Sequence, residues 1–520
     1  MASEMSWKET LARRRAVEAE ALQAGGAARS AKPENGPRLS ARARIETLLD
    51  AGSFTELNML AEHQCRDFGM ENRKVPGDGV VTGYGSIGGR RVFIYAEDEN
   101  VLGGSTGRTH GAKIHYVLRL ARETRVPIIC LNASAGARIQ EGMDNVYGIT
   151  GMFHQNVLNS GVVPQIAAVM GTCSGGAAYT SALCDFLIQV ESAPLFVIGP
   201  AVTREITGEE VTTEDLGGAG LHGRFSGVAH LTARDDRECL DLIRRLLDFL
   251  PQSNRETPSR RDCRDPADRQ VAELVDIVPI EGSKTYDMKE VIRVLVDDGD
   301  FFEIHPSFAG NLVVGFARLG GAVTGIVANN PRHLDGFLDI DSSNKGARFI
   351  RTCDAFNIPL VSLVDSPGFR PGLQQERGGI IRHGAKLLYA WSEAVVPKIS
   401  VVLRKMHGGA IPAMGVHEIG FDQVFAWPSA EMQIIAAGPA VRILYRRELE
   451  NATDPDAFFD EKVREYRDSC MSPYHASSRS VVDAVIEPKD TRRVIISALR
   501  MLDGKQAPNR AGRRHGNIPL

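Results

Sequence analysis

The sequence contains one series of short motifs twice, at an offset of about 233 residues. Eleven positions separate a proline from a Gly-Gly-Ala turn in each copy, and two later motifs follow in the same order. The first series is Val162-Val163-Pro164-Gln165-Ile166, Gly175-Gly176-Ala177, Ser192-Ala193 and Gly199-Pro200-Ala201-Val202, and the second is Val395-Val396-Pro397-Lys398-Ile399, Gly408-Gly409-Ala410, Ser429-Ala430 and Gly438-Pro439-Ala440-Val441. So long a period in a chain of 520 residues indicates a duplicated domain rather than a solenoid of short repeats.

Composition favours a globular protein with sizeable cores, because 43% of the residues are hydrophobic and 24% are charged. A net charge of −4 gives no reason to expect nucleic acid or an anionic membrane as a partner. The sequence contains no run of eighteen apolar residues, which a membrane span would require. The first thirty residues also lack the apolar core of a secretory signal. Glu4, Glu9, Glu18 and Glu20 disfavour a mitochondrial transit peptide. We therefore expect a cytoplasmic protein.

The eight cysteines form no Cys-x-x-Cys pair, which argues against a zinc ribbon. Several lie in apolar surroundings, as Cys130 does after Val126-Pro127-Ile128-Ile129, and these are typical of reduced, buried thiols. No cluster of histidine, cysteine and aspartate has ligand spacing. We therefore predict that the chain binds no metal.

Short β-type runs alternate with helical segments in both halves, which predicts an α/β fold with mainly parallel strands. The runs are continuously apolar, as expected for strands covered on both faces. Helices are also expected over residues 6–24 and from an N-cap at Ser40 to about Asp50. The expected elements of the two halves are strand 91–95, helix 111–123, strand 126–131 and a run within 161–170, then strand 323–328, helix 346–356, strand 358–364 and strand 395–403.

The best linker candidate is the polar, proline-containing segment 251–261, and the boundary falls between about 252 and 275. The predicted organisation is a helical extension over 1–38, an N-terminal domain over 39–260 and a C-terminal domain over 270–520.

Four glycine-rich turns follow apolar runs, at the position where parallel sheets bind ligands. Their small residues leave backbone N–H groups accessible, and a pair of such donors can hold a developing oxyanion. The alternative reading is that the glycines only permit tight turns. The turns are Asn132-Ala133-Ser134-Ala135-Gly136-Ala137, Cys173-Ser174-Gly175-Gly176-Ala177, Asp365-Ser366-Pro367-Gly368-Phe369 and His407-Gly408-Gly409-Ala410.

Other catalytic classes find little support in the sequence. No P-loop and no Gly-x-Ser-x-Gly elbow occurs. Ser134 and Ser174 have no nearby histidine and aspartate in a triad arrangement, while His383 and His407 are of a kind that more often only forms hydrogen bonds. What remains is chemistry in which backbone amides act on carbonyl oxygens, such as enolate formation from a thioester.

At these residues the chain resembles the carboxyltransferase (β) subunits of biotin-dependent acyl-CoA carboxylases of the propionyl-CoA and acetyl-CoA type. The resemblance extends from about Ser40 to Leu520. The motifs that carry it are Pro76-Gly77-Asp78-Gly79-Val80-Val81-Thr82-Gly83, Ala137-Arg138-Ile139-Gln140-Glu141-Gly142, Ser226-Gly227-Val228-Ala229-His230, Ser342-Ser343-Asn344-Lys345-Gly346-Ala347-Arg348-Phe349, Gly378-Gly379-Ile380-Ile381-Arg382-His383-Gly384-Ala385-Lys386 and His515-Gly516-Asn517-Ile518-Pro519-Leu520.

The resemblance implies two tandem crotonase-like domains (the ClpP/crotonase ββα superhelix) and a homohexamer with active sites between domains of different subunits. It implies that the amides of Ala135 and Gly136 hold the acyl-CoA thioester oxygen, and that those of Gly409 and Ala410 hold the carboxybiotin ureido oxygen. Gly175-Gly176-Ala177 is then expected to contact substrate. CO2 would pass from carboxybiotin to the α-carbon of a short acyl-CoA.

Departures from the family pattern point to the acyl pocket and to the first turn. Ala133 and Ala135 replace an aspartate and a glycine. Ile411-Pro412 stands where the family often has Tyr-Asp, and Phe337 stands where a cysteine is common. Phe337, Ile411 and Pro412 are therefore expected to shape an apolar acyl pocket, so that the preferred acyl group is not necessarily propionyl.

The chain has no Met-Lys-Met biotinylation motif, so biotin is expected on a partner, a biotin carboxylase/biotin carrier α subunit. Two alternatives stay open. A biotin-dependent decarboxylase or transcarboxylase would use the same half-reaction in reverse, and a non-catalytic assembly scaffold is favoured only by Ala133 and Ala135.

Overall fold

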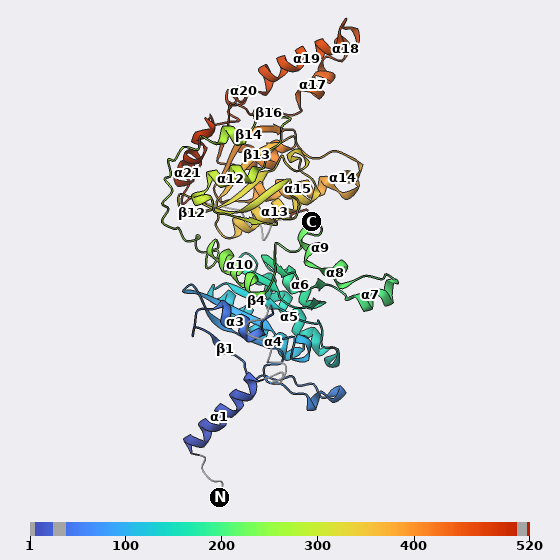
Figure 1. Cartoon of the computed structure of the whole chain (residues 1–520), viewed down its shortest axis with the longest axis vertical. Helices are drawn as coiled ribbons and strands as arrows, with labels where there is room; N and C mark the ends of the chain where they lie inside the picture. The colour runs from blue at the N-terminus through green and yellow to red at the C-terminus, as the bar shows by residue number, and fades with distance from the viewer. Residues whose placement is uncertain (1–5, 24–37, 507–516, 520) are drawn as a thin grey trace. The chain divides into compact units, whose positions relative to one another are not determined.

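The computed structural model describes residues 6–23, 38–506 and 517–519, and the chain divides into two compact units, Met1–Glu256 and Thr257–Leu520. Each unit contains one large sheet covered by helices (Figure 1). Among the described residues, no helix is both long and apolar enough to cross a membrane.

The first unit contains nine named helices and nine strands among its described residues. The helices are α1 (Trp7–Leu22), α3 (Ala41–Leu48), α4 (Arg108–Thr124), α5 (Asp144–Asn159), α6 (Gly176–Ala182), α7 (Pro200–Thr207), α8 (Thr213–Gly217), α9 (Ala219–Arg224) and α10 (Asp236–Asp248). The strands are β1 (Thr55–Leu57), β2 (Val80–Ile87), β3 (Arg90–Glu97), β4 (Ile128–Asn132), β5 (Gln165–Val169), β6 (Cys173–Ser174), β7 (Phe186–Val190), β8 (Leu195–Phe196) and β9 (Leu231–Ala233).

The second unit begins with the short helix α11 and ends with α21. Its helices are α11 (Leu274–Ile277), α12 (Met288–Leu295), α13 (Ile340–Ala355), α14 (Leu373–Gly378), α15 (Ile380–Glu393), α16 (Ala410–Met414), α17 (Ala437–Leu444), α18 (Arg446–Asn451), α19 (Pro455–Tyr466), α20 (Pro473–Ser477) and α21 (Thr491–Met501). Its strands are β10 (Phe301–Ile304), β11 (Leu312–Leu319), β12 (Ala322–Asn329), β13 (Leu360–Ser366), β14 (Lys398–His407), β15 (Gln423–Ala426), β16 (Glu431–Gln433) and β17 (Ala484–Val485).

The two main sheets have the same topology. The first has the strand order β1-β2-β3-β4-β5-β7-β9, and the second has β10-β11-β12-β13-β14-β15-β17 with β16 beside β14. In both, an antiparallel three-stranded meander leads into parallel strands. The central parallel strands are buried throughout, which explains their continuous apolar runs.

The expected helices and strands are present, including the helix that begins at Ser40, whose Oγ accepts from the amide of Ala43 at 3.2 Å. The antiparallel meander was not expected. It arises because two-glycine turns, Gly88-Gly89 and Gly320-Gly321, join β2 to β3 and β11 to β12 with positive φ at both positions. Such a turn matches the twist of a tight hairpin and leaves no room for a crossover helix.

The repeat extends further than the motifs indicated. β3, α4 and β4 of the first unit begin 232 residues before β12, α13 and β13 of the second. In the second unit, the core lies between the sheet and the helices α12 and α21. In the first unit, α4 and α5 pack against the sheet through Ile114, Val117 and Met152.

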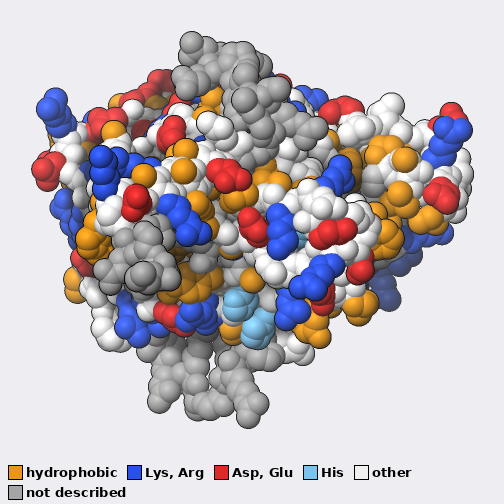
Figure 2. Space-filling model, turned by 90° about the horizontal axis from the view of Figure 1, so that it is seen from below, with side chains coloured by type: hydrophobic (Ala, Val, Ile, Leu, Met, Phe, Trp, Pro, Cys, Tyr) orange, Lys and Arg blue, Asp and Glu red, His pale blue; other side chains and the backbone are white. Residues whose placement is uncertain are grey.

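The segment after residue 256 packs with the second unit, where the amide of Arg261 donates to Gly321 O at 3.0 Å. The predicted limits of 260 and 270 thus lie slightly beyond the observed division. Part of the predicted extension over 1–38 forms α1, whereas 24–37 lie outside the described residues. In the second unit, α17, α18 and α19 extend away from the sheet (Figure 1). On the face shown in Figure 2, basic and acidic side chains are interspersed.

Candidate active site

The Gly408-Gly409-Ala410 turn presents two backbone donors. It connects β14 to α16, and Gly408 adopts a φ of +53° while its own amide donates to Gln433 O at 2.9 Å. The amides of Gly409 and Ala410 have no acceptor among the residues that the structure describes. Two adjacent N–H groups at the start of a helix are therefore available to a carbonyl oxygen.

The first unit repeats this arrangement at Gly175-Gly176-Ala177. Gly175 has a φ of +59°, and its amide donates to Val197 O at 3.1 Å. The amides of Gly176 and Ala177, which open α6, likewise lack an acceptor within the described part of the chain. Each unit thus presents one pair of unbonded donors at the same point of the repeat.

Close packing explains the second glycine of each turn. A Cβ at Gly409 would lie 2.5 Å from Cδ2 of Phe369, and a Cβ at Gly176 would lie 2.8 Å from Cγ2 of Ile149. Both distances are below any real Cβ contact, so a side chain at either position would displace the ring, the isoleucine or the turn itself. The absence of a side chain is therefore what keeps each pair of donors in place.

The predicted first-turn pair, Ala135 and Gly136, is engaged within the unit. The amide of Ala135 donates to Gly103 O at 3.0 Å, and that of Gly136 donates to Ser134 Oγ at 3.2 Å. Ala135 has no positive φ, so the alanine fits its backbone without strain. Both amides therefore have acceptors, whereas those of Gly176 and Ala177 have none among the described residues.

The turn from Ala133 to Gly136 instead supports the donor pair. Ser134 O accepts the amide of Ser174 at 3.0 Å, immediately before Gly175. A Cβ at Gly136, whose φ is +92°, would lie 3.1 Å from Ser174 O. The two turns are therefore in direct contact, and a displacement of one displaces the other.

The three residues expected to shape the acyl pocket are half-buried in the second unit. Ile411 and Pro412 belong to the first turn of α16, where a proline costs no intrahelical hydrogen bond. Phe337 ends a 3-10 turn, and its carbonyl accepts from Nδ2 of Asn311 at 2.7 Å. Their role in acyl selection stays a prediction.

Neither histidine near the second-unit turns is placed as a general base. His407 is buried, and burial together with Lys405 and Arg467 lowers its pKa to about 4. The ring is therefore neutral at physiological pH, and its Nε2, 3.8 Å from a carboxylate oxygen of Glu431, forms no hydrogen bond to a described residue. His383 hydrogen-bonds Asn344 at 2.9 Å, and burial and nearby cations lower its pKa as well.

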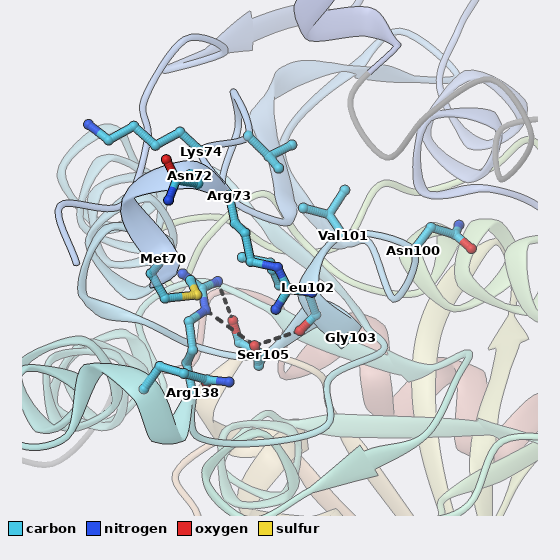
Figure 3. A pocket seen from close by; sticks show the side chains of 12 residues that line it. Met70, Asn72, Arg73, Lys74, Asn100, Val101, Leu102, Gly103, Ser105 and Arg138 are labelled. Atoms are coloured by element: carbon cyan, nitrogen blue, oxygen red, sulfur yellow. Dashed lines mark hydrogen bonds between the residues drawn. The ribbon is translucent and has the colours of Figure 1, made fainter. Parts of the chain in front are cut away.

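A cavity of about 610 Å³ lies beside the first-unit turns (Figure 3). Its wall includes Gly103, the acceptor of the Ala135 amide, and the buried guanidinium of Arg138, which donates to Ser105 O and Oγ at 2.7 and 3.2 Å. Arg73 and Lys74 line the same cavity and are exposed. The cavity is therefore lined by two exposed cations and by polar backbone next to the turn.

Contacts made by three residues at or behind these turns went unrecognised in the sequence. Phe369 packs on Gly409, and Glu97 accepts the amide of Ala133 at 2.9 Å while facing His110. Extending the 232-residue offset upstream would have paired Glu97 with Asn329, which accepts the amide of Asp365. This internal alignment was the available signal.

Among the described residues, no group of three or more histidine, cysteine, aspartate and glutamate side chains could hold a metal ion. None of the eight cysteines forms a disulfide bond, and five of them are buried: Cys130, Cys173, Cys184, Cys239 and Cys353.

Known proteins resemble the chain over nearly its whole length. Residues 34–518 match the family model of the carboxyl transferase domain. The propionyl-CoA carboxylase carboxyltransferase subunit of Haloferax mediterranei is 50% identical over 502 residues, which cover 96% of this chain and 97% of that protein. The methylmalonyl-CoA decarboxylase subunit alpha of Propionigenium modestum is 46% identical, with coverages of 95% and 96%.

A solved structure of transcarboxylase 12S, described as a hexamer assembly with methylmalonyl-coenzyme A and methylmalonic acid bound, superposes with a TM-score of 0.95. It is 47% identical, and the match covers 100% of this chain and 99% of that one. The predicted crotonase-like α/β fold is thereby confirmed. The chain belongs to the carboxyl transferase domain family, as an acyl-CoA carboxyltransferase of the propionyl-CoA carboxylase type.

Proposed function

We propose that the chain is the carboxyltransferase subunit of a biotin-dependent acyl-CoA carboxylase and that each unit supplies one carbonyl-binding site. Gly176 and Ala177 hold the thioester oxygen of the acyl-CoA, and Gly409 and Ala410 hold the ureido oxygen of carboxybiotin. The observation that carries this assignment is the pair of unbonded amides at the same point of each repeat. Carboxybiotin, carried by a partner protein, supplies the CO2.

The amides of Gly176 and Ala177 stabilise the negative charge that develops on the thioester oxygen during the reaction. Removing the α-proton of a thioester places negative charge on its oxygen, and two fixed N–H donors stabilise that charge more than they stabilise the neutral thioester. Loss of one such donor typically costs about 10²–10³ in rate. This is why the chemistry requires no nucleophilic side chain from this chain.

The cavity lined by Arg73 and Lys74 suits the anionic end of the same substrate. Both cations line the cavity and are exposed, and coenzyme A carries phosphates far from its thioester. Replacing both cations by glutamate is expected to raise KM for the acyl-CoA by about tenfold or more through charge repulsion, with a smaller effect on kcat.

We infer a homohexamer, because the transcarboxylase 12S structure is described as a hexamer assembly. Exposed apolar side chains on the projecting helix α17, Ile443 and Leu444, support further contacts between copies. Light scattering on the purified protein tests this. The expected partner remains a biotin carboxylase/biotin carrier subunit, and the expected location remains the cytoplasm.

The function is tested by ATP-dependent fixation of labelled bicarbonate with the biotin-bearing partner present. Acetyl-, propionyl- and butyryl-CoA should be compared, and label should appear in an acid-stable acyl product. Label in none of them, with a partner shown to carry carboxybiotin, would contradict the proposal.

The reverse direction is the second candidate, because methylmalonyl-CoA decarboxylase subunits are nearly as similar in sequence as carboxylase subunits. Release of CO2 from methylmalonyl-CoA without ATP, in the presence of the native partner, would favour it. The scaffold alternative has lost its basis, since Ala135 fits its turn without strain and the family is enzymatic.

A further inference from the structure

A buried carboxyl–imidazole pair lies behind the first-unit turns. Glu97 ends β3 and His110 lies in the first turn of α4, and the side chains are 2% and 0% exposed. Oε1 of Glu97 lies 3.3 Å from Nε2 of His110, while Oε2 accepts the amide of Ala133 at 2.9 Å. Both carboxyl oxygens are therefore committed to partners.

The partners of the imidazole fix the number of protons in this pair. Nδ1 lies 2.9 Å from Asp78 O, and a carbonyl oxygen only accepts, so Nδ1 carries a hydrogen. A second proton must then lie between Nε2 and the carboxyl group. Without it, the lone pair of Nε2 would face an ionised carboxylate oxygen in a buried site. The carboxyl and the imidazole thus share one proton, whichever of them holds it.

The charged groups around the pair are compensated by one another. Oδ2 of Asp78 accepts the amide of His110 at 2.9 Å, and its Oδ1 lies 2.6 Å from Arg138. Arg138 also pairs with Glu141 at 2.8 Å, and the amino group of Lys113, whose pKa burial lowers to about 8, donates to Gly77 O nearby. None of these groups supplies the hydrogen that Nε2 and the carboxyl group share.

The side of the pair that faces the sheet is neutral. Burial raises the pKa of both Tyr95 and Cys173. Neither side chain ionises near neutral pH. If the shared proton were lost, the pair would carry one uncompensated negative charge next to the turn.

The second unit shows the same support without a titratable pair. Asn329 stands at the position of Glu97, and its Oδ1 accepts the amide of Asp365 at 3.3 Å. Ser342 stands at the position of His110 and instead forms the capping box of α13 with Asp339. A neutral amide therefore suffices to hold this turn, and the proton is an addition specific to the first unit.

We propose that Glu97 is a positioning residue for the thioester site: its Oε2 holds the amide of Ala133, and the proton that its Oε1 shares with His110 keeps the carboxyl group in that position. The connection runs from the carboxyl group to the amide of Ala133, and from Ser134 O to the amide of Ser174, directly before the donor pair. The inference rests on the proposed assignment of the thioester oxygen to Gly176 and Ala177.

Three substitutions of Glu97 separate its functions. Glu97→Gln retains an acceptor for the Ala133 amide and gains an N–H for Nε2, so kcat/KM for the acyl-CoA should stay within threefold of wild type. Glu97→Leu removes both contacts and should lower kcat/KM at least tenfold, mainly through kcat, in an intact oligomer. Glu97→Asp keeps a carboxyl group but withdraws it from the Ala133 amide, so its kcat/KM should lie below those of wild type and Glu97→Gln; this variant replaces Glu97→Leu if the leucine variant does not fold.

The shared proton has its own readout in the pH dependence of the melting temperature. The hydrogen-bond geometry places one proton between the two side chains of the folded protein, and an unfolded chain at pH 8 has no such shared proton, so the folded wild type binds one proton more. Raising the pH therefore favours unfolding, and the melting temperature should fall more steeply between pH 7 and 9 in wild type than in Glu97→Gln. Equal slopes of melting temperature against pH in wild type and Glu97→Gln would show that the pair shares no proton.

The positioning role would be overturned if Glu97→Leu had the wild-type kcat/KM for the acyl-CoA. If only Glu97→Asp folds, the same result in that variant would overturn it. Failure of the thioester assignment is distinguishable from both results. In that case Gly176→Ala would retain full acyl-CoA turnover, while the difference in melting slope would persist.

Discussion

Gly409→Ala tests whether the position of the biotin-side donors controls the rate. The new Cβ would lie 2.5 Å from Cδ2 of Phe369, and ordinary contact begins near 3.4 Å, so the ring or the turn must move by about 0.9 Å. The φ of Gly409 is −64°, so the substitution adds no backbone strain. A displacement of about 1 Å at a reacting centre costs about 10² in rate, which corresponds to about 2.7 kcal/mol.

The assay is transfer of labelled carboxylate from the carboxylated partner to acyl-CoA, measured as kcat/KM for the carboxylated partner. Gly409→Ala should lose about 10²-fold, and the double variant with Phe369→Ala should recover at least tenfold of that, because the clash is removed. Gly282→Ala, where a Cβ meets nothing within 4 Å, is the matched control and should behave as wild type. Full activity of Gly409→Ala in an intact oligomer would refute the reasoning.

Three further outcomes follow from the second unit. Lys345→Met should destabilise the protein by about 2–4 kcal/mol, measured by denaturant unfolding, because the buried amino group donates to the backbone carbonyls of His305, Phe308 and Ala309. His407 takes up a proton only near pH 4 when folded but near 6.5 when unfolded, so stability should fall by roughly 3 kcal/mol as the pH drops through that window, and His407→Gln should abolish this loss. Pro412→Asp should shift relative kcat/KM toward propionyl-CoA across an acyl-CoA panel; an unchanged ranking would show that Pro412 does not select the acyl group.

The duplicated fold and its glycine turns were predictable because their signals are local. A Gly-Gly-Ala turn after an apolar run is read directly from neighbouring residues, and the structure places Gly175 and Gly408 at equivalent positions with positive φ. The two-glycine hairpins were equally local, but they were not used because the alternating helices and strands suggested mainly parallel pairing.

The donor assignment in the first unit depended on contacts that span the sequence. The amide of Ala135 is occupied by Gly103 O, and nothing in the local sequence of the turn indicates that acceptor. The same holds for the Glu97–His110 pair, whose members belong to different elements. The sequence shows which side chains and turns are present. Which backbone amides have an acceptor becomes visible only in the folded structure.

The most direct test of the two-site account is a structure of the oligomer with an unreactive acyl-CoA analogue bound. The account predicts the thioester oxygen, or the oxygen that replaces it, about 2.7–3.1 Å from the amide nitrogens of Gly176 and Ala177. An oxygen held instead by the amides of Ala135 and Gly136, or bound in the second unit at Gly409 and Ala410, would contradict it.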